Sequence, residues 1–583
     1  MRRLALLFAL ASCASAQEQM IREVIDTKTD THVEITALFS GPAPRGYLPV
    51  RVKMANRLES NRSVTLSFDS TASSYGYSYG RGDGGKMSSS FTFDAPAEKN
   101  TEHDILVPLP TVITSDDGSM NVSVRLSGSM GAATNSISAQ FGDKLPAVLL
   151  GENLYTANAS ELDKEIASRS SGRSGRTEFA SKFDARMMPD DWRAYSGYDS
   201  ILMTDAEWTA SSPGAKNAVV VWTRLGGQLV IYTDSASLAS LGLPDDSSYG
   251  SITLARTAGA LKLDAAKTVD LVTKKPPVPA QLTSLNGDYS SSWPLQHEFG
   301  QVGFNYAVFI VILIAFGVIV GPVNLFVFAK TGRRHRLFIT TPLISLAASL
   351  ILVLLILIQD GFGGRGARAV LMEVRPDRNE NAAYLHQEQF SRTGVLTGAR
   401  FTLQEPAAIS PVPLDSDNRW ARLTLRNGGS DNGYAANFVD GKLETSGDWF
   451  QSRSEQGQIL DSVVPTRGRI ELSGSGTPVL LSTFEFPIET LYYQDAAKKW
   501  WKATNLQPGA KVTPTSVSDT EVKNAVADES RRFGARHRAM LTKASIRPGT
   551  FVAVTNSAPG VETYKSIKWQ STRTVITGPA FTP

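Results

Sequence analysis

Two long apolar runs dominate the hydrophobic pattern near the middle of the chain. They cover residues 306–329 and 337–358, and neither contains Asp, Glu, Lys or Arg. About twenty predominantly apolar residues are enough to cross a bilayer core of ~30 Å as a helix. The pattern therefore predicts a transmembrane hairpin over 304–360, with its two helices joined by the turn 330–336.

The basic residues of this turn predict the orientation of the hairpin. Four of its seven residues are basic: Lys330, Arg333, Arg334 and Arg336. Basic turns next to membrane spans stay on the cytoplasmic side. We therefore expect a two-pass protein whose two large segments, before and after the hairpin, are both extracytoplasmic.

The amino terminus gives a second, independent topology signal. Residues 1–16 combine two early arginines, a short apolar core and Ala14-Ser-Ala16, which together are typical of a cleaved signal peptide. Leu10-Ala-Ser-Cys13 also fits a bacterial lipobox, in which Cys13 would be lipidated. Ordinary cleavage is favoured because the hairpin already anchors the chain and one acyl chain adds only weak binding. Both interpretations, cleavage and lipidation, predict that the segment that follows is exported.

Small residues inside the two apolar runs predict how the helices pack. Each run carries a small-xxx-small motif at a matching depth, and the four residues are Gly317, Gly321, Ser345 and Ser349. Such notches allow close contact between helix backbones, so we expect the helices to pack there. Pro322 should kink the first helix, and Asn324 is available to satisfy the freed carbonyl groups.

The segment 17–142 alternates between apolar and polar positions in short stretches separated by Gly, Pro, Asn and Ser. Examples are Val64-Thr-Leu66-Ser-Phe68 and Val122-Ser-Val124-Arg-Leu126. Period-two alternation with regular breaks is typical of antiparallel strands packed face to face. We predict an N-terminal β-sandwich here.

The pattern changes in the segment 143–285, where short continuous apolar runs alternate with helical stretches. Pro213 to Leu225 has Pro at its start and Gly226-Gly227 at its end, and a strand follows directly. This order predicts a parallel sheet flanked by helices. Asp205 and Asp234 follow predicted strands at the edge where such sheets bind ligands, although aspartates there also cap loops.

The same segment resembles a known domain. It contains Trp192-x-x-Tyr195-x-x-Tyr198-Asp-Ser-Ile201, then a helix carrying Val-Val-Val-Trp222, then Gly226-Gly227-x-Leu-Val. This order resembles the glutamine-amidotransferase-like, flavodoxin-type domain of exported bacterial proteins. Active members of that class use a Cys and a His, and residues 145–285 contain neither. The resemblance therefore implies a non-catalytic α/β module.

The hairpin carries a second resemblance. Gly321-Pro-Val-Asn324, the basic turn and Thr341-Pro342 resemble the signature of poorly characterised bacterial two-helix envelope membrane proteins. That resemblance implies a β-sandwich and an amidotransferase-like module before the hairpin, and a β-rich domain after it. It also implies that the membrane is a bacterial inner (cytoplasmic) membrane.

The remaining segments flank the hairpin. Residues 286–303 form a polar, proline-marked juxtamembrane approach, and alternating stretches after residue 361 predict a β-rich exported domain over 361–583. One helix is expected near 519–541, with its arginines late, where cations suit the helix dipole. The spacing of acidic and amide residues over 377–388 partly matches a calcium-binding loop, but Ala382 stands where the sharp turn of such a loop needs Gly.

The composition of the chain limits the kinds of partner and reaction that we expect. The net charge of the 583 residues is only +3, which gives no reason to expect nucleic acid as a partner. The single cysteine is Cys13, so thiolate chemistry and disulfides are not expected in the mature chain, and the six histidines are scattered along the sequence. We therefore predict no catalytic residue, no metal and no cofactor.

These patterns lead to one functional hypothesis and two alternatives. The first is a non-enzymatic envelope membrane protein that presents exported interaction or ligand-binding modules to other envelope proteins. One alternative is an envelope hydrolase or amidotransferase-like enzyme with a non-Cys site near Asp205 and Asp234. The other is an accessory subunit of a transport or signalling complex.

Overall fold

The computed structural model describes most of the chain. The described residues are 18–75, 83–112, 117–142, 146–169, 178–245, 249–257, 261–274, 293–299, 306–328, 332, 334–375, 381–412, 433–439, 441–474, 477–545 and 547–582. The predicted signal peptide with Cys13, and Lys330 and Arg333 of the basic turn, lie outside these residues.

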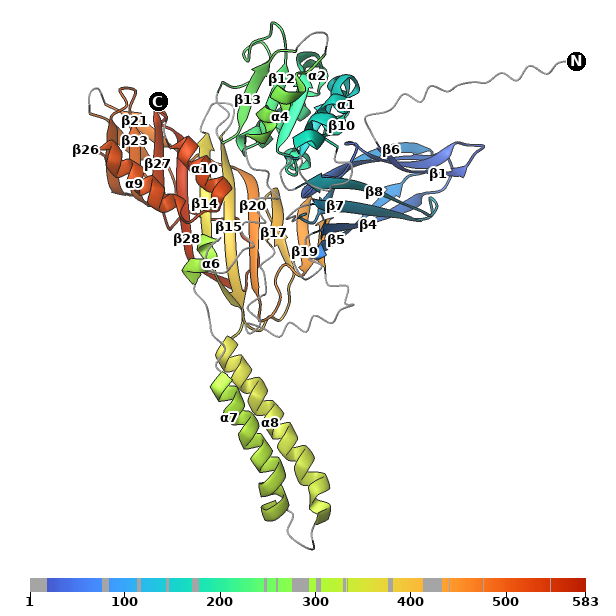
Figure 1. Cartoon of the computed structure of the whole chain (residues 1–583), viewed down its shortest axis with the longest axis vertical. Helices are drawn as coiled ribbons and strands as arrows, with labels where there is room; N and C mark the ends of the chain where they lie inside the picture. Colours follow the sequence, from blue (N-terminus) through green and yellow to red (C-terminus); the bar gives the residue numbers. More distant parts are fainter. Residues whose placement is uncertain are drawn as a thin grey trace, which may run out of the picture.

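The protein is multidomain and strand-rich, with several sheets and two apolar helices that extend from one end of the body (Figure 1). The α/β module lies at the end of the body that is opposite to these two helices. A β-sandwich and a large, mostly antiparallel sheet make up most of the rest.

The N-terminal sandwich packs two sheets face to face. The first sheet has the order β1 (Glu18–Asp26), β2 (Thr31–Ala37), β3 (Gly46–Asn56), β6 (Lys99–Leu109). The second contains β4 (Arg62–Tyr75), β5 (Asp83–Ala95), β7 (Asp117–Gly128) and β8 (Ala133–Gly142). Alternate residues such as Val50 and Val52 of β3 and Val64 and Leu66 of β4 are buried between the sheets, as the alternation predicted.

The second sheet of the sandwich also contains strands from beyond the hairpin. Its order is β16-β19-β18-β5-β4-β7-β8, where β16 is Phe401–Leu403, β18 is Tyr434–Val439 and β19 is Lys442–Gly447. Strand β18 runs parallel to β5, with Tyr434 opposite Met87. The expected boundary at residue 361 therefore does not separate independent domains. The residue pattern of a strand does not show which distant strand it pairs with, so the sequence could not reveal this pairing.

The α/β module contains a five-stranded parallel sheet. The strands are β9 (Val148–Gly151), β10 (Ser181–Phe183), β11 (Ser200–Thr204), β12 (Gln228–Tyr232) and β13 (Ser251–Ala255), in the order β10-β9-β11-β12-β13. The helices are α1 (Glu152–Arg169), α2 (Asp205–Ala210), α3 (Pro213–Arg224) and α4 (Ala265–Thr273), with short 3₁₀ turns at Ala185–Met187 and Trp192–Tyr195. All residues of β11 and β12 are buried, which explains their continuous apolar runs.

The two faces of this parallel sheet bury different helices. Leu202 and Val230 lie in one apolar cluster with residues of α1 and α4. Ile201 and Leu229 lie in another, together with residues of α2, α3 and the sandwich. The module and the sandwich therefore share one hydrophobic core.

A nine-stranded sheet forms the centre of the C-terminal segment. Its order is β17 (Ala407–Val412), β20 (Glu455–Pro465), β15 (Ala382–Thr393), β14 (Gly364–Arg375), β28 (Ile567–Pro579), β27 (Thr550–Thr555), β23 (Ile488–Gln494), β24 (Trp500–Leu506), β26 (Thr515–Val517). Strands β14 and β28 pair in parallel, and the other neighbours are antiparallel. A small sheet of β21 (Ile470–Ser473), β22 (Val479–Ser482) and β25 (Lys511–Val512) lies beside it.

The helix expected near 519–541 is two helices, α9 (Asp519–Ser530) and α10 (Ala535–Ala544). The chain turns between them, and Gly534 has an extended backbone at the start of α10. Phe533 in this turn is fully buried against the nine-stranded sheet. Burial of this ring, together with the weak helix propensity of Gly534, explains the break.

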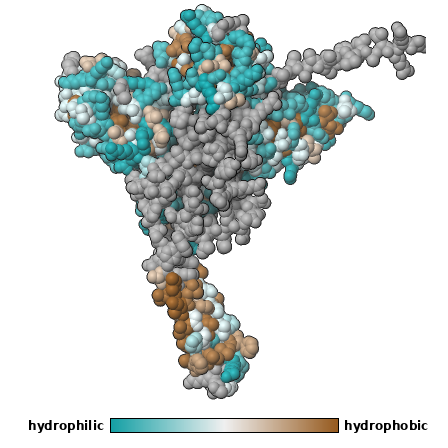
Figure 2. Space-filling model, viewed as in Figure 1, coloured by the Kyte–Doolittle hydropathy of each residue, from teal (hydrophilic) through white to brown (hydrophobic). Residues whose placement is uncertain are grey.

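The two apolar helices are long and apolar enough to cross a membrane. The candidate spans are Ile310–Phe328, with 19 residues, and Arg334–Leu354, with 21 residues. They are built from α7 (Tyr306–Val318), the π-helical segment η3 (Ile319–Phe328), η4 (Arg334–Arg336) and α8 (Leu337–Asp360), and the short helix α6 (Pro294–Phe299) precedes them. Apolar side chains cover their outer surface, in contrast to the polar body (Figure 2).

The contact between these helices differs from the expected one. An added Cβ at Gly317 or Gly321 would meet no atom within 4 Å, and Ser349 is exposed. Asn324 is instead fully buried, where it accepts a hydrogen bond from Thr340 at 2.6 Å and donates one to Thr341 at 2.9 Å. Pro322 has no N–H to donate and lies in the π-helical segment. The wider turn of this segment changes which side chains of the first helix face the second helix. Asn324 therefore bonds across the hairpin.

The backbones of the sandwich and the α/β module lie close together at a pair of glycines. Gly46 has a φ of +76°, and a Cβ on it would lie 2.8 Å from the backbone nitrogen of Gly197. A Cβ on Gly197 would lie 2.2 Å from the carbonyl oxygen of Arg45. Nearby, the ring of Tyr198 packs edge-on against Phe39, and its hydroxyl donates a hydrogen bond to the carbonyl of Gly41 at 3.1 Å.

Replacing Asn324 by Leu should weaken the contact between the two apolar helices by about 0.5 to 1.5 kcal/mol, because two interhelical hydrogen bonds are lost. Gly317→Ala should change the contact little, since its new methyl group would meet no neighbour. The measurement is unfolding of the full chain in mixed micelles. Equal losses of stability in the two variants would contradict a contact made through Asn324.

Gly197→Ala should destabilise the protein by about 1 to 3 kcal/mol, because its methyl group would collide with the backbone of Arg45. Gly41→Ala is the matched control, since its Cβ would make only ordinary contacts of 3.7 Å with Ala139 and Ser181. Thermal denaturation of both variants tests the close approach. A Gly41→Ala variant that loses as much stability would show that the sandwich and the module do not approach as described.

Candidate functional site

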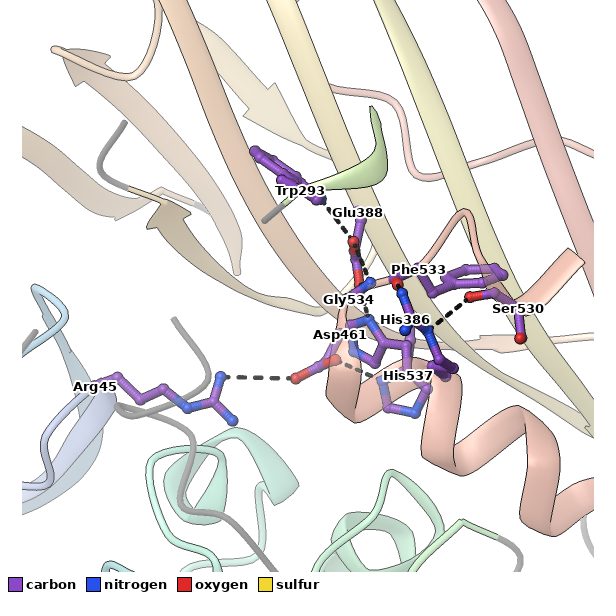
Figure 3. Close-up of polar contacts among 10 residues, drawn as sticks. Arg45, Trp293, His386, Glu388, Asp461, Ser530, Phe533, Gly534 and His537 are labelled. Atoms are coloured by element: carbon purple, nitrogen blue, oxygen red, sulfur yellow. Dashed lines mark hydrogen bonds and ion pairs between the residues drawn. The ribbon is translucent and has the colours of Figure 1, made fainter. Parts of the chain in front are cut away.

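Four buried ionisable side chains meet on one face of the nine-stranded sheet, and we call them the histidine–carboxylate cluster: His386, Glu388, Asp461 and His537 (Figure 3). His386 and Glu388 lie two residues apart on β15 and therefore point to the same face. Asp461 is opposite His386 in the register of β20. His537 comes from α10.

Glu388 is held by three hydrogen-bond donors although it is only 1% exposed. Its carboxylate accepts from the indole N–H of Trp293 at 2.7 Å, from the backbone N–H of Gly534 at 2.9 Å and from Nδ1 of His537 at 2.6 Å. Gly534 precedes α10, so the carboxylate also lies at the positive end of that helix. These contacts offset the cost of burying a charge.

Asp461 and His386 form the second pair, with 2.7 Å between Nδ1 and the carboxylate. Burial alone would raise the pKa of Asp461, but the hydrogen bond from His386 and nearby positive charges hold that pKa well below its usual range. Burial lowers the pKa of His386 in spite of its contact with Asp461. The pair is therefore an ionised carboxylate and a neutral imidazole whose Nδ1–H points to it.

Arg45 reaches the cluster from the sandwich, just before β3. It is 4% exposed, and its nearest carboxylate oxygen is that of Asp461 at 4.0 Å. Its buried Nε has no hydrogen-bond partner among the described residues. Burial, and next the positive charge of Arg536, lower the pKa of Arg45 to about 10.

The α/β module contacts the cluster through Tyr249. This side chain is 1% exposed, packs edge-on against the ring of His386 at 5.2 Å and lies 3.0 Å from the hydroxyl of Thr577. Lys543 of α10 donates a hydrogen bond to the carbonyl of Gly250 in the same module. The sandwich, the α/β module and the C-terminal sheet therefore all meet at the histidine–carboxylate cluster.

The cluster can bind a cation or relay a proton. The rings of His386 and His537 lie 5.1 Å apart at 30° to each other. His386, Asp461 and His537 can each offer one ligand atom, and these atoms all lie within 4.8 Å of one another. Nε2 of His386 is buried and has no hydrogen-bond partner in the described part of the chain.

The predicted residues Asp205 and Asp234 lie elsewhere, at the carboxyl ends of β11 and β12. Asp205 accepts hydrogen bonds from the hydroxyl of Thr233 at 2.6 Å and from the N–H of Ala206 at 2.7 Å, while Asp234 is exposed. Ligand binding at this edge stays a prediction.

Glu207 occupies the neighbouring strand end. Its carboxylate accepts hydrogen bonds from the N–H of Thr204 at 2.8 Å and from the N–H of Asn153 at 2.9 Å, at the start of α1. A Cβ on Gly151 would lie 2.4 Å from this carboxylate. Glu207 therefore fills the space above the end of β9.

Sequence reasoning missed the cluster, because its members are separated by up to about 150 residues and come from three elements. One local signal was present. His386-Gln-Glu388-Gln389 is a run of polar residues within β15, and all four side chains are buried. Buried polar groups require specific partners, so such a run inside a predicted strand marks a site.

Comparisons with known proteins give no family. No protein-family model matches the chain, and no curated protein matches it. Among solved structures, the sporulation control protein Spo0M from Bacillus subtilis matches 19% of this chain and 47% of its own length, with 13% identity and a TM-score of 0.13. The yeast delta-COP-I mu-homology domain, solved with a Dsl1 WxWxV peptide, matches 38% of this chain and 98% of its own, with 9% identity and a TM-score of 0.18. TM-scores this low establish no shared fold.

Glu388→Ala should destabilise the protein by about 3 to 5 kcal/mol, because it leaves three buried donors without their acceptor. Glu161→Ala is the control: this carboxylate pairs with Lys262 at 3.5 Å and both side chains are more than half exposed, so its loss should cost less than about 1 kcal/mol. Denaturant unfolding of both variants measures the difference. Similar losses would show that Glu388 is not the buried anchor described above.

Proposed function

We propose that this chain is a non-enzymatic, two-pass protein of a bacterial inner membrane that presents its exported modules to other envelope proteins. The observation that carries this proposal is the pairing of β18 with β5. Strand β5 precedes the apolar hairpin in the chain and β18 follows it, and the N–H of Ser90 also donates to the side chain of Asn437 at 2.8 Å.

Segments that share a sheet must lie on the same side of a membrane, because a bilayer cannot separate hydrogen-bonded strands. The chain between β5 and β18 must therefore cross the membrane an even number of times. Two apolar helices supply two crossings. The basic residues Arg334 and Arg336 in the connection favour a cytoplasmic turn, so that the sheets lie outside the cytoplasm.

The arrangement of the body supports a presenting role. The α/β module lies at the end of the body opposite to the apolar helices (Figure 1). It shares a core with the sandwich and contacts α10 through Gly250. The exported part would therefore act as one rigid unit that displays the module away from the membrane.

The topology of the module supports a flavodoxin-type fold without catalysis. Numbered along the chain, its strands have the order 2-1-3-4-5, which is the flavodoxin-like order. In such folds the chemistry takes place above the carboxyl ends of the strands. Glu207 fills that space above β9, and Thr233 already bonds the carboxylate of Asp205.

Cysteine labelling tests this topology, since a Cys13→Ala variant has no other cysteine. Lys28→Cys, Glu444→Cys and His335→Cys would be added to it one at a time, at exposed positions in the sandwich, in β19 and in the turn. A membrane-impermeant maleimide should label the first two in intact spheroplasts. It should label the third only after lysis.

Different labelling of the Lys28→Cys and Glu444→Cys variants would contradict the even number of crossings. Labelling of the His335→Cys variant in intact spheroplasts would show that the orientation is opposite to the proposed one. Cross-linking of the correctly oriented chain in cells should then recover other envelope proteins, as a presenting role requires.

A further inference from the structure

We infer that the end of the nine-stranded sheet beside the apolar helices binds the phosphate groups of anionic phospholipids in the adjacent leaflet. The binding surface is a row of three cations on neighbouring strands, which we call the membrane-proximal basic row: Arg392 of β15, Arg365 of β14 and Lys568 of β28. The inference rests on the proposed function, because it requires the apolar helices to cross a bilayer. It adds a lipid partner for the body of the protein.

The sheet begins directly where the second apolar helix ends (Figure 1). Helix α8 ends at Asp360, and β14 starts at Gly364. Two hydrogen bonds fix the short connection: the N–H of Val395 donates to the carbonyl of Gly361 at 2.9 Å, and the N–H of Gly364 donates to the carbonyl of Ser566 at 3.0 Å. These strand ends are therefore held close to the end of the span.

The basic row lies within the electrostatic reach of the lipid headgroups. A connection of about five residues, from the end of α8 to Arg365, spans at most ~18 Å. It is not extended here, since Gly361 and Gly363 have φ values of +70° and +77°. Headgroups add roughly 5 to 7 Å to each side of the hydrocarbon core, and their field extends about 8 Å further at physiological ionic strength.

The three cations face the same side of the sheet. Arg365 is directly opposite Arg392 on one side and opposite Lys568 on the other. Side chains at opposite positions of neighbouring strands are about 4.5 to 5.5 Å apart at Cβ, and like charges there repel each other. An anion bound along the row would remove this repulsion.

The other two arginines of β14 show that Arg365 differs from its neighbours. Arg368 pairs with Glu562 at 2.7 Å, and Arg375 at the far end of the strand pairs with Glu373 at 2.8 Å. Arg365 is exposed and has no carboxylate partner in the described part of the chain. The arginine closest to the span is therefore the one whose counter-charge the described protein does not supply.

Arg392 connects the row to the segment that enters the membrane. Its guanidinium pairs with Glu455 at 2.7 Å and lies over the ring of Phe299 at 5.2 Å. Phe299 ends α6, the helix that precedes the first apolar helix. Lys568 is exposed and, within the described ranges, pairs with no carboxylate. The row therefore keeps an excess of positive charge between the segments that enter and leave the bilayer.

An exposed aromatic ring lies at the same place. Phe362 follows α8 in the connection to β14 and is 72% exposed. Outside the two apolar helices it is the most exposed large apolar side chain that the structure describes. A bilayer surface would cover this ring, which no described part of the protein does.

These features favour phospholipid over other anionic partners. The forked guanidinium of Arg365 matches the oxygens of a phosphate. Each lysine or arginine close to an anionic bilayer strengthens attraction to it about fivefold. Bound headgroups would also fix the body relative to the bilayer, so that the α/β module is held at the far end.

The test measures the Tm of the full chain in neutral detergent as phosphatidylglycerol or phosphatidylcholine is added. Phosphatidylglycerol should raise the Tm more than phosphatidylcholine does. In an Arg365→Gln, Lys568→Gln double variant, the phosphatidylglycerol concentration that gives half of the rise should increase about fivefold or more. The basic turn 330–336 is unchanged in every variant, so its own lipid contacts do not contribute to the difference.

Two further variants are the controls. Lys28→Gln with Arg125→Gln removes the same charge from exposed positions in the sandwich and should respond to phosphatidylglycerol as the wild type does. Arg365→Lys with Lys568→Arg keeps both charges and should retain most of the response. Without lipid, the Arg365→Gln, Lys568→Gln variant should be at least as stable as the wild type, because like charges no longer lie opposite each other.

A phosphatidylglycerol response that is unchanged in the Arg365→Gln, Lys568→Gln variant would overturn the lipid site. A lower Tm of this variant without lipid would also overturn it, since the two cations would then serve the fold. An equal rise with inorganic phosphate would replace the lipid by a free anion. The row faces the bilayer whichever side the body occupies, so reversed cysteine labelling would overturn the proposed orientation and leave the lipid site intact.

Discussion

Strand β18 follows the apolar hairpin in the chain and completes a sheet begun by β5, and this pairing constrains the whole architecture. It places the segments on both sides of the hairpin together. It also extends the sandwich with β16 and β19, so that the sandwich and the nine-stranded sheet are linked through one stretch of chain. The contact is supported by side chains, since the ring of Tyr47 packs against Phe438 and its hydroxyl donates to the carbonyl of Ala407 at 3.1 Å.

The junction of the modules is polar at its centre, although apolar clusters surround it. Burying Glu388, Asp461 and Arg45 is costly in itself, and a purely apolar junction would give comparable or greater stability. The contribution of such polar contacts is geometric, because each buried charge must find its partners for the junction to form. The carboxylate of Glu388 joins distant parts of the chain, since it accepts from Trp293, just before α6, and from Gly534, just before α10.

Local patterns were sufficient where local physics determines the structure. The continuous apolar runs identified the buried strands β11 and β12, and the alternation identified β4 and β7. Asp205 and Asp234 do lie at strand ends, because the apolar runs before them marked where β11 and β12 end. In each of these cases the residues that form the element are neighbours in the sequence.

The failures have a common cause in contacts between distant segments. The face of the first apolar helix depends on a π segment around Pro322, which composition does not reveal, so Asn324 and not the glycines meets the second helix. Helix α9 ends before Phe533 because that ring is buried in a sheet formed elsewhere. The histidine–carboxylate cluster brings together β15, β20 and α10. Its only local signal in the sequence was the run of polar residues at 386–389.

The distance between β5 and β18 has a consequence for the biogenesis of the protein. Ser90 and Asn437 are 347 residues apart. During synthesis, the edge of β5 that pairs with β18 must stay open until both apolar helices and the chain up to β18 have been made. Open edges of this kind pair readily with other chains, and contacts at such separation form slowly. The open edge of β5 should therefore need protection from other chains during the interval before β18 arrives.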